Sequence, residues 1–168
     1  PIMGDEGKLY NGVTDQTVEN MRRLIGVADV IVPNLTEAQF LVGRHKGKEA
    51  LNREESRELI DGLLEYGPRS VVITSGVEKE SGAHVVWGYS AAEKGYFTLP
   101  YRYIKVHFPG TGDMFYAVLV GELLSGKTLR DGVQRAMEVL EQMIFLERNE
   151  LEKKRGIRIE RFLDVLNG

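Results

Sequence analysis

The chain has 168 residues, 42% of them hydrophobic and 28% charged, which suits one ordinary globular domain with a core of its own. Its 25 acidic and 22 basic residues leave a net charge of −3, and the basic residues are scattered, so neither a nucleic-acid nor a membrane partner is expected. The lack of cysteine excludes disulfides, zinc–thiolate sites and cysteine nucleophiles, and makes the cytoplasm the expected location.

The chain begins with helical and strand patterns that alternate. Residues 17–25 place apolar side chains at helical spacing, which predicts a helix. The short apolar run 28–32 predicts a buried parallel strand. Residues 36–39, Thr-Glu-Ala-Gln, have the form of a capping box, so we expect a helix to run from Thr36 to about residue 42.

The same alternation continues before the pattern changes. Residues 54–66 predict a helix and residues 70–74 a buried strand, so the order so far is typical of a layered α/β sheet. Aromatic and β-branched residues then dominate the runs 85–87, 96–99 and 103–106. These three runs predict antiparallel strands.

The last third of the chain is helical in pattern. Residues 114–124 are apolar nearly all round, which predicts a helix buried in the middle of the fold. A single apolar stripe predicts a long surface helix after it; its members are Leu129, Val133, Met137, Leu140 and Ile144. Residues 160–166 predict a last short helix.

The clearest chemical signal is the segment 109–115, Pro-Gly-Thr-Gly-Asp-Met-Phe, between a strand pattern and an apolar helix. Gly110 and Gly112 let the backbone approach a ligand closely, and the following helix presents unpaired N–H groups with a partial positive charge. Such a turn suits a phosphate in transfer, and Asp113 beside it can accept the proton of an attacking hydroxyl. Taken alone, the segment is better explained as a glycine turn with an acidic residue in the first helical turn, so its neighbours decide.

Polar residues also lie in one loop and at two strand ends. Asp5 lies in a glycine-rich loop, where a carboxylate can help to hold a metal ion, although a plain polar loop explains it too. Asn34 and Glu37 lie beyond a strand end, where open α/β sheets bind ligands; Glu37 is surplus to the capping box and can act on magnesium through water. Thr74 and Ser75, also at a strand end, suit a nucleotide or a simple turn.

These segments, in this order, resemble the ribokinase superfamily and, within it, the pyridoxal kinases. Residues 110–113 are similar to the superfamily's anion hole and catalytic aspartate, and residues 34–37 to its Asn-x-x-Glu motif. Residues 1–10 resemble the Asp-Pro-Val-Met-Gly-Asp loop of pyridoxal kinases and the tyrosine after it, and residues 71–75 resemble their nucleotide-side strand. The resemblance implies a ribokinase-like three-layer α/β/α fold with a mainly parallel sheet and a small antiparallel section.

The resemblance also implies an activity: ATP-dependent, Mg²⁺-assisted phosphorylation of the 5′-hydroxymethyl group of pyridoxal, pyridoxine or pyridoxamine. Asp113 is then the expected base, and the backbone N–H groups of Gly110, Thr111 and Gly112 are expected to stabilise the γ-phosphoryl charge. The remaining expected roles are metal contacts by Asp5 and Glu37, ATP contacts by Tyr10, Asn34, Thr74 and Ser75, and an adenine-side lining by Phe108 and Phe115. The resemblance also allows a K⁺ ion and a homodimer.

Two departures from the family pattern bear on function. The family loop has an aspartate before its proline, whereas this sequence begins at Pro1, and the family's N-terminal half, with the vitamer pocket and lid, is not in it. We therefore expect residues 1–168 to be the C-terminal, nucleotide-binding part of one kinase domain. The alternatives are a hydroxymethylpyrimidine kinase of the same superfamily and a non-catalytic fragment or nucleotide-binding module.

Overall fold

The chain forms two compact units, each with a hydrophobic core of its own. The computed structural model describes residues 2–106, 108–149, 156–162 and 164. The units are Pro1–Tyr101 and Arg102–Gly168. No helix among the described residues is long and apolar enough to span a membrane. That both units belong to one kinase domain stays a prediction.

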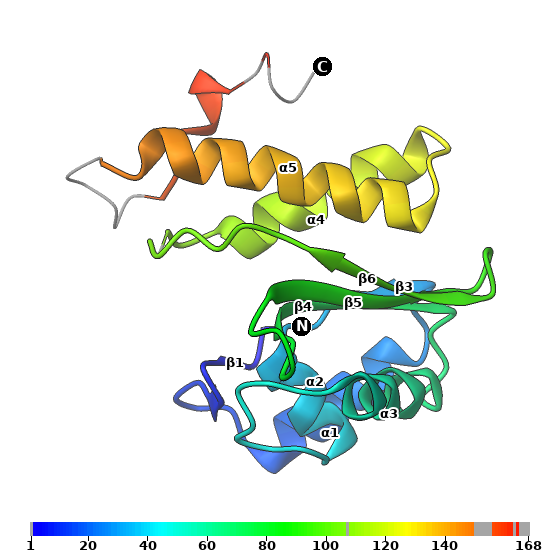
Figure 1. Ribbon diagram of the computed structural model, residues 1–168. Helices are drawn as coiled ribbons and strands as arrows, with labels where there is room; N and C mark the ends of the chain where they lie inside the picture. The colour runs from blue at the N-terminus through cyan, green and yellow to red at the C-terminus, as the bar shows by residue number, and fades with distance from the viewer. Residues whose placement is uncertain (1, 107, 150–155, 163, 165–168) are drawn as a thin grey trace. The chain divides into compact units, whose positions relative to one another are not determined.

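The first unit is a mixed sheet with three helices on one face (Figure 1). Its elements in chain order are β1 (Gly4–Asp5), β2 (Lys8–Leu9), α1 (Asp15–Ile25), β3 (Val30–Ile31), α2 (Leu35–Val42), α3 (Arg53–Leu64), β4 (Ser70–Val77), β5 (His84–Ser90) and β6 (Gly95–Pro100). The first two strands form a separate antiparallel hairpin, and the sheet has the order β3-β4-β5-β6. β3 and β4 are parallel, whereas β5 and β6 join antiparallel, so both kinds of pairing that the sequence predicted are present. The described sheet is not mainly parallel as predicted, because two of its three strand pairings are antiparallel.

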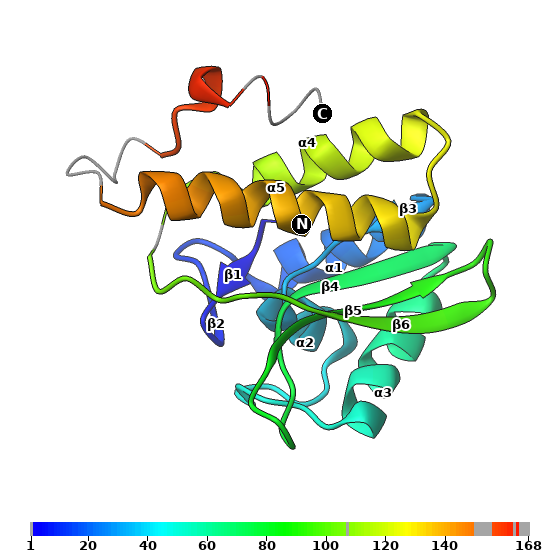
Figure 2. The ribbon, with the colours of Figure 1, turned by 45° about the horizontal axis from the view of Figure 1, so that its top comes forward.

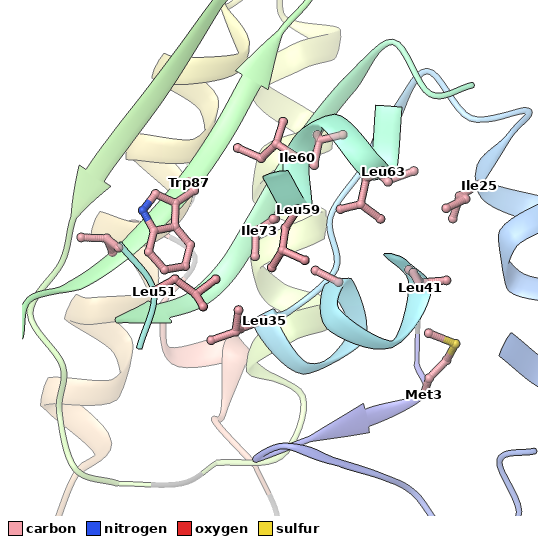
Figure 3. Packing of buried hydrophobic residues seen from close by; sticks show 14 of the residues in the cluster. Met3, Ile25, Leu35, Leu41, Leu51, Leu59, Ile60, Leu63, Ile73 and Trp87 are labelled. Atoms are coloured by element: carbon pink, nitrogen blue, oxygen red, sulfur yellow. The ribbon is translucent and has the colours of Figure 1, made fainter. Parts of the chain in front are cut away.

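The core of this unit lies between the sheet and its helices. Alternate residues of β4 and β5 face the helices, because successive side chains of a strand point to opposite faces. Figure 3 shows Ile73 and Trp87 pointing toward the apolar side chains of α2 and α3. The buried members of this cluster are Met3, Val18, Ile25, Ile31, Leu35, Ala38, Leu41, Leu51, Leu59, Ile60, Leu63, Val71, Ile73, Val85 and Trp87.

The opposite face of the sheet is apolar as well. Val72 of β4 is buried, and Val86 of β5 is paired with Leu99 of β6, both of them buried too. Strands that are apolar on both faces are typical of a sheet covered on both sides. This composition is the one expected of a layered α/β fold.

The start of α2 differs from the prediction. Asn34, not Thr36, is the N-cap: its Oδ1 accepts a hydrogen bond from the Glu37 N–H at 2.9 Å, and Glu37 Oε2 accepts one from the Asn34 N–H at 3.0 Å. The expected box of Thr36 with Gln39 is therefore wrong. Gln39 is instead buried in the helix, where its Nε2 donates to the Lys48 carbonyl at 2.8 Å.

Two predicted strands also differ from the structure: one is longer, and the other is absent. β4 runs on to Val77 across an irregularity between Ile73 and Gly76, where Ser75 has a φ of 58°. Residues 103–106 are not a strand. The Val106 N–H instead donates to the Ile104 carbonyl at 2.6 Å, and such a bond between residues two apart belongs to a tight turn.

The second unit is built on two helices that run side by side, α4 (Thr111–Leu124) and α5 (Leu129–Glu147) (Figures 1 and 2). The first three members of the predicted stripe of α5, Leu129, Val133 and Met137, are buried, whereas Leu140 and Ile144 are half-buried. The core of the second unit also includes Phe108, Val139, Met143, Ile157 and Phe162. After α5 the described chain has one 3₁₀ turn, η2 (Ile159–Arg161), and residues 163, 165 and 166 of the predicted last helix lie outside the described residues.

The expectation that α4 is buried all round is not met. Phe115 and Leu119 are its buried residues, whereas Val120 is 52% exposed and Leu124 is 84% exposed. A helix packed lengthwise on one neighbour buries one stripe, and in its own unit α4 packs lengthwise on α5.

Candidate functional site

Three side chains at the start of α2 hold the loop of residues 3–10. Glu37 Oε1 accepts a hydrogen bond from the Met3 N–H at 2.9 Å, and Asn34 Nδ2 donates to the Gly4 carbonyl at 2.8 Å. Thr36 Oγ1 accepts from the Gly7 N–H at 2.8 Å. We name these three side chains the α2 clamp. Because each bond joins residues about 30 positions apart, the clamp fixes the loop onto the end of the sheet.

Glu37 is the carboxylate of the clamp, and it is buried. It is 2% exposed, and each carboxylate oxygen accepts one backbone N–H. Burial raises the pKa of Glu37, and the hydrogen bonds from the Asn34 and Met3 backbone oppose that rise. The structure thus gives Glu37 a holding role that the sequence did not indicate, because its partner Met3 is 34 residues away.

The clamped loop gathers acidic groups around an exposed tyrosine. Asp5 is exposed, and its Oδ1 accepts from the Glu6 N–H at 2.9 Å. Tyr10 is 48% exposed, and its pKa is raised by partial burial and by the nearby carboxylates of Asp5, Glu37 and Glu6. Among the described residues, no three His, Cys, Asp or Glu side chains group as a metal site. The metal roles of Asp5 and Glu37 therefore stay predictions.

The structure brings two further predicted residues together at the neighbouring strand ends. Asn34 and Thr74 form a parallel bridge just beyond β3, and the Thr74 N–H donates to the Pro33 carbonyl at 3.0 Å. Ser75 follows, exposed and in a left-handed conformation. The carboxyl ends of parallel strands are where open α/β sheets bind ligands, so this edge, with the clamped loop beside it, is a candidate site.

The glycine turn of the second unit has the backbone that the sequence predicted. Gly110 is the N-cap of α4 with a φ of 87°, and no side chain among the described residues caps the helix. The Met114 N–H makes the first helical bond, to the Gly110 carbonyl at 3.1 Å, so the N–H groups of Thr111, Gly112 and Asp113 precede the helical ladder. Asp113 is exposed in the first turn. An uncapped helix start with two glycines can receive an anion, and a carboxylate next to it can receive a proton.

The two aromatic residues expected to line the adenine are packed inside the protein. Phe108 is 2% exposed and Phe115 is 5% exposed. Phe108 packs with Val139 and Met143 of α5. Their contact with a nucleotide stays a prediction, and the structure shows both as core residues. The predicted site residues thus form two sets, one in each unit.

Comparison with known proteins places the chain in a family. The family model described as phosphomethylpyrimidine kinase matches residues 7–158. A pyridoxal kinase of Arabidopsis thaliana is 36% identical over 126 residues, which are 72% of this chain and 38% of that protein. A solved structure from Bacteroides thetaiotaomicron, provisionally named a phosphomethylpyrimidine kinase, is 34% identical with a TM-score of 0.91 and is matched over 99% of this chain and 57% of its own. A pyridoxal kinase of Leishmania donovani, solved with ADP and pyridoxamine, is 28% identical with a TM-score of 0.78 over 98% of this chain and 55% of its own.

These matches confirm the resemblance and its α/β fold, although they cover only part of each relative. The chain spans between about two fifths and three fifths of the length of these relatives. Both names in the comparison, pyridoxal kinase and phosphomethylpyrimidine kinase, belong to proteins that this chain is similar to. The match over residues 7–158 and the 34% identity in an almost superimposable fold agree on one conclusion: the chain belongs to the phosphomethylpyrimidine kinase family.

Proposed function

We propose that this chain provides the nucleotide and phosphate side of a kinase that transfers the γ-phosphoryl group of ATP to the 5′-hydroxymethyl group of pyridoxal, pyridoxine or pyridoxamine. The observation that supports this function best is the uncapped start of α4, where exposed Asp113 follows the left-handed Gly110. The presence of ADP and pyridoxamine in the related Leishmania donovani structure supports the choice of substrates.

In the proposed reaction Asp113 acts as the base. It accepts the proton of the 5′-hydroxyl as that oxygen attacks the γ-phosphorus, and the bond from that phosphorus to the bridging oxygen of ADP breaks. Negative charge grows on the oxygens of the phosphoryl group in transfer. The N–H groups of Gly110, Thr111 and Gly112 stabilise that charge, because those of Thr111 and Gly112 precede the first helical bond of α4 and point out of the helix start.

The first unit supplies the proposed contacts to ATP and metal. Tyr10, Asn34, Thr74 and Ser75 contact the nucleotide phosphates, and Asp5 lies beside a Mg²⁺ ion. An exposed carboxylate among other acidic groups fits Mg²⁺, which usually takes one or two protein carboxylates together with phosphate oxygens. When bound, the metal neutralises developing phosphoryl charge. A K⁺ ion and a homodimer are further parts of the proposal.

The experiment is a phosphorylation assay with ATP and Mg²⁺ on a panel of acceptors: the three B6 vitamers, hydroxymethylpyrimidine and ribose. In the complete kinase, with its substrate-binding half, we expect turnover of a vitamer, and a fall of about 100-fold or more in Asp113→Asn, the scale of a lost general base. Binding of Mg·ADP, measured by calorimetry, should be kept in the variant. A near-normal rate in Asp113→Asn would remove Asp113 from this role.

The matched family model and the Bacteroides thetaiotaomicron structure favour a second candidate, a kinase of hydroxymethylpyrimidine. Preference for that acceptor in the panel would select it. A third candidate is a nucleotide-binding module without turnover. It would bind Mg·ADP while phosphorylating none of the acceptors.

A further inference from the structure

Glu147 is a buried carboxylate that the proposed reaction does not use. It is 3% exposed and lies at the C-terminal end of α5. A negative charge is unfavourable there, because the end of a helix carries a partial negative charge of its own. Burial of an unpaired carboxylate is also costly. Glu147 therefore needs cationic partners to stay in this place.

Two arginines of the segment 156–162 provide that charge. Arg158 Nη2 donates to Glu147 Oε2 at 2.9 Å and to Oε1 at 3.3 Å, and Arg158 Nε donates to Oε2 at 3.3 Å. Arg161 Nη1 donates to Oε1 at 3.3 Å. A planar guanidinium that contacts both carboxylate oxygens fixes direction as well as distance. The cluster thus attaches the segment to the end of α5.

The attached segment contacts the residues that lead into the glycine turn. Ile157 and Phe162 pack in one cluster with Phe108, which is buried two positions before Gly110. At Gly156 the two backbones meet, since a β-carbon there would lie 3.0 Å from the Pro109 carbonyl oxygen.

Among the described residues, the turn itself has few other supports. No described side chain caps α4, and Gly110 has the φ of 87° that glycine adopts without steric cost. Thr111 Oγ1 donates to the Phe108 carbonyl at 3.4 Å, so the turn is also tied back to Phe108. The direction of the N–H groups in the turn therefore depends on where Phe108 is held.

We propose that the segment 156–162, fixed by the ion cluster of Glu147 with Arg158 and Arg161, is the support that positions the glycine turn 109–113. Glu147 is then a positioning residue for the anion that the turn binds. The identity of that anion, an ATP phosphate, rests on the proposed function. The mechanical link from Glu147 to the turn rests on contacts within the second unit alone.

The test compares Glu147→Gln with Glu138→Gln in the full chain. Glu138 is a matched control, because it lies on the same helix, is exposed and bonds to Gln134 on its own helix. Deuterium exchange of the ligand-free chain is measured peptide by peptide. In Glu147→Gln we expect faster exchange both in residues 156–162 and in residues 108–114, with α1 to α3 unchanged. Glu138→Gln should exchange like the unaltered chain.

Binding of Mg²⁺ with a non-hydrolysable ATP analogue gives the second reading, because the turn is proposed to contact the γ-phosphate, which ADP lacks. Loss of an N–H bond to the charged phosphate should weaken this binding between roughly 10-fold and 100-fold in Glu147→Gln. Arg161→Gln, which removes the bond from Arg161 to Glu147 at the exposed edge of the cluster, should show a smaller change in the same direction. This milder variant gives the answer if Glu147→Gln does not fold.

The outcomes separate this inference from the proposed function. Faster exchange limited to residues 156–162, with the turn unchanged in exchange and in binding, would overturn the positioning role. Faster exchange throughout the chain in both Glu147→Gln and Arg161→Gln would overturn it as well. If the unaltered chain binds no nucleotide, the proposed function fails, whereas the exchange of residues 108–114 still decides whether Glu147 positions the turn.

Discussion

Two helices of the first unit begin with the same Asn-x-x-Glu pattern, and one of them also holds the candidate site. In both, a glutamate oxygen accepts the backbone N–H of the asparagine at 3.0 Å, for Glu37 with Asn34 and for Glu55 with Asn52. The second oxygen differs: that of Glu37 accepts the Met3 N–H, whereas that of Glu55 faces a lysine ammonium. Replacing either glutamate by glutamine therefore removes one charge from the same cap position, but only Glu37→Gln disturbs the loop of residues 3–10.

The size of the effect follows from the atoms that glutamine keeps. Its one carbonyl oxygen can accept one of the two N–H groups, and its amide nitrogen then faces the other. A buried donor left unpaired costs about 1–3 kcal/mol. Removing a buried charge recovers part of this cost, because burial disfavours the ionised form of Glu37. We expect Glu37→Gln to lower the free energy of unfolding of the first unit by about 1–2 kcal/mol.

The assay uses Trp87, the single tryptophan of the chain, which lies in β5 of the first unit. Urea unfolding followed by its fluorescence reports the stability of that unit, and deuterium exchange of residues 2–10 reports the loop. Glu37→Gln should lower the stability of the first unit and speed the deuterium exchange of residues 2–10, whereas Glu55→Gln should leave the exchange of those residues unchanged. Equal effects of the two substitutions would refute the α2 clamp as a support of the loop.

Three further predictions use other features of the structure. Gly110→Ala should lower stability by about 1–2 kcal/mol, because alanine is strained at a φ of 87°. Gly112→Ala, whose new β-carbon enters open space within α4, should raise stability by about 0.5–1 kcal/mol. Thermal unfolding of the two variants checks the contrast. Gly76→Ala should cost about 1–3 kcal/mol and shift the fluorescence of the single tryptophan, because the new β-carbon would lie 2.4 Å from its ring; an unchanged spectrum would contradict the packing. The hydrogen bond from Lys48, with the N–H of the helix cap, lowers the pKa of Glu55 from 4.5 to about 2, so its stabilising contribution is present above pH 4.5 and is lost as the pH falls through about 2. An NMR titration of its carboxyl carbon that gives a pKa near 4.5 would show that this ion pair is absent in solution.

Local patterns predicted most elements of the fold, because apolar spacing and breaker residues act over a few positions. The helices around residues 17–25, 54–66 and 129–144 and the strands β3 to β6 lie near their predicted places, whereas the hairpin of β1 and β2 was not predicted. The cap of α2 was placed two residues late, since Thr36 with Gln39 and Asn34 with Glu37 fit the same spacing. Asparagine is the stronger N-cap of the two, and this preference was the signal that could have chosen between them.

Contacts between distant residues could not be predicted in the same way. The partner of the Glu37 carboxylate is Met3, and the partners of Glu147 are Arg158 and Arg161, which lie 11 and 14 positions further along the chain. In the sequence, Lys-Arg and Glu residues near the C-terminus have the composition of a solvated helix end. The burial of Glu147 distinguishes this ion cluster from charged residues at a solvated helix end. Burial depends on packing that no short pattern encodes.

The Asn-x-x-Glu spacing shows how far a motif can support a function by itself. An asparagine cap and a glutamate three residues later bond to each other because of helix geometry, so the spacing recurs wherever a helix is capped in this way. It does so at residues 34–37 and again at residues 52–55, where nothing else of the candidate site is near in sequence. What distinguishes residues 34–37 is two hydrogen bonds that helix capping does not use. The Asn34 side-chain amide donates to the Gly4 carbonyl, and the second Glu37 oxygen accepts the Met3 N–H. These contacts fix the loop that presents Asp5, so a substitution of Asn34 or Glu37 can displace that loop whether or not the side chain itself contacts a ligand.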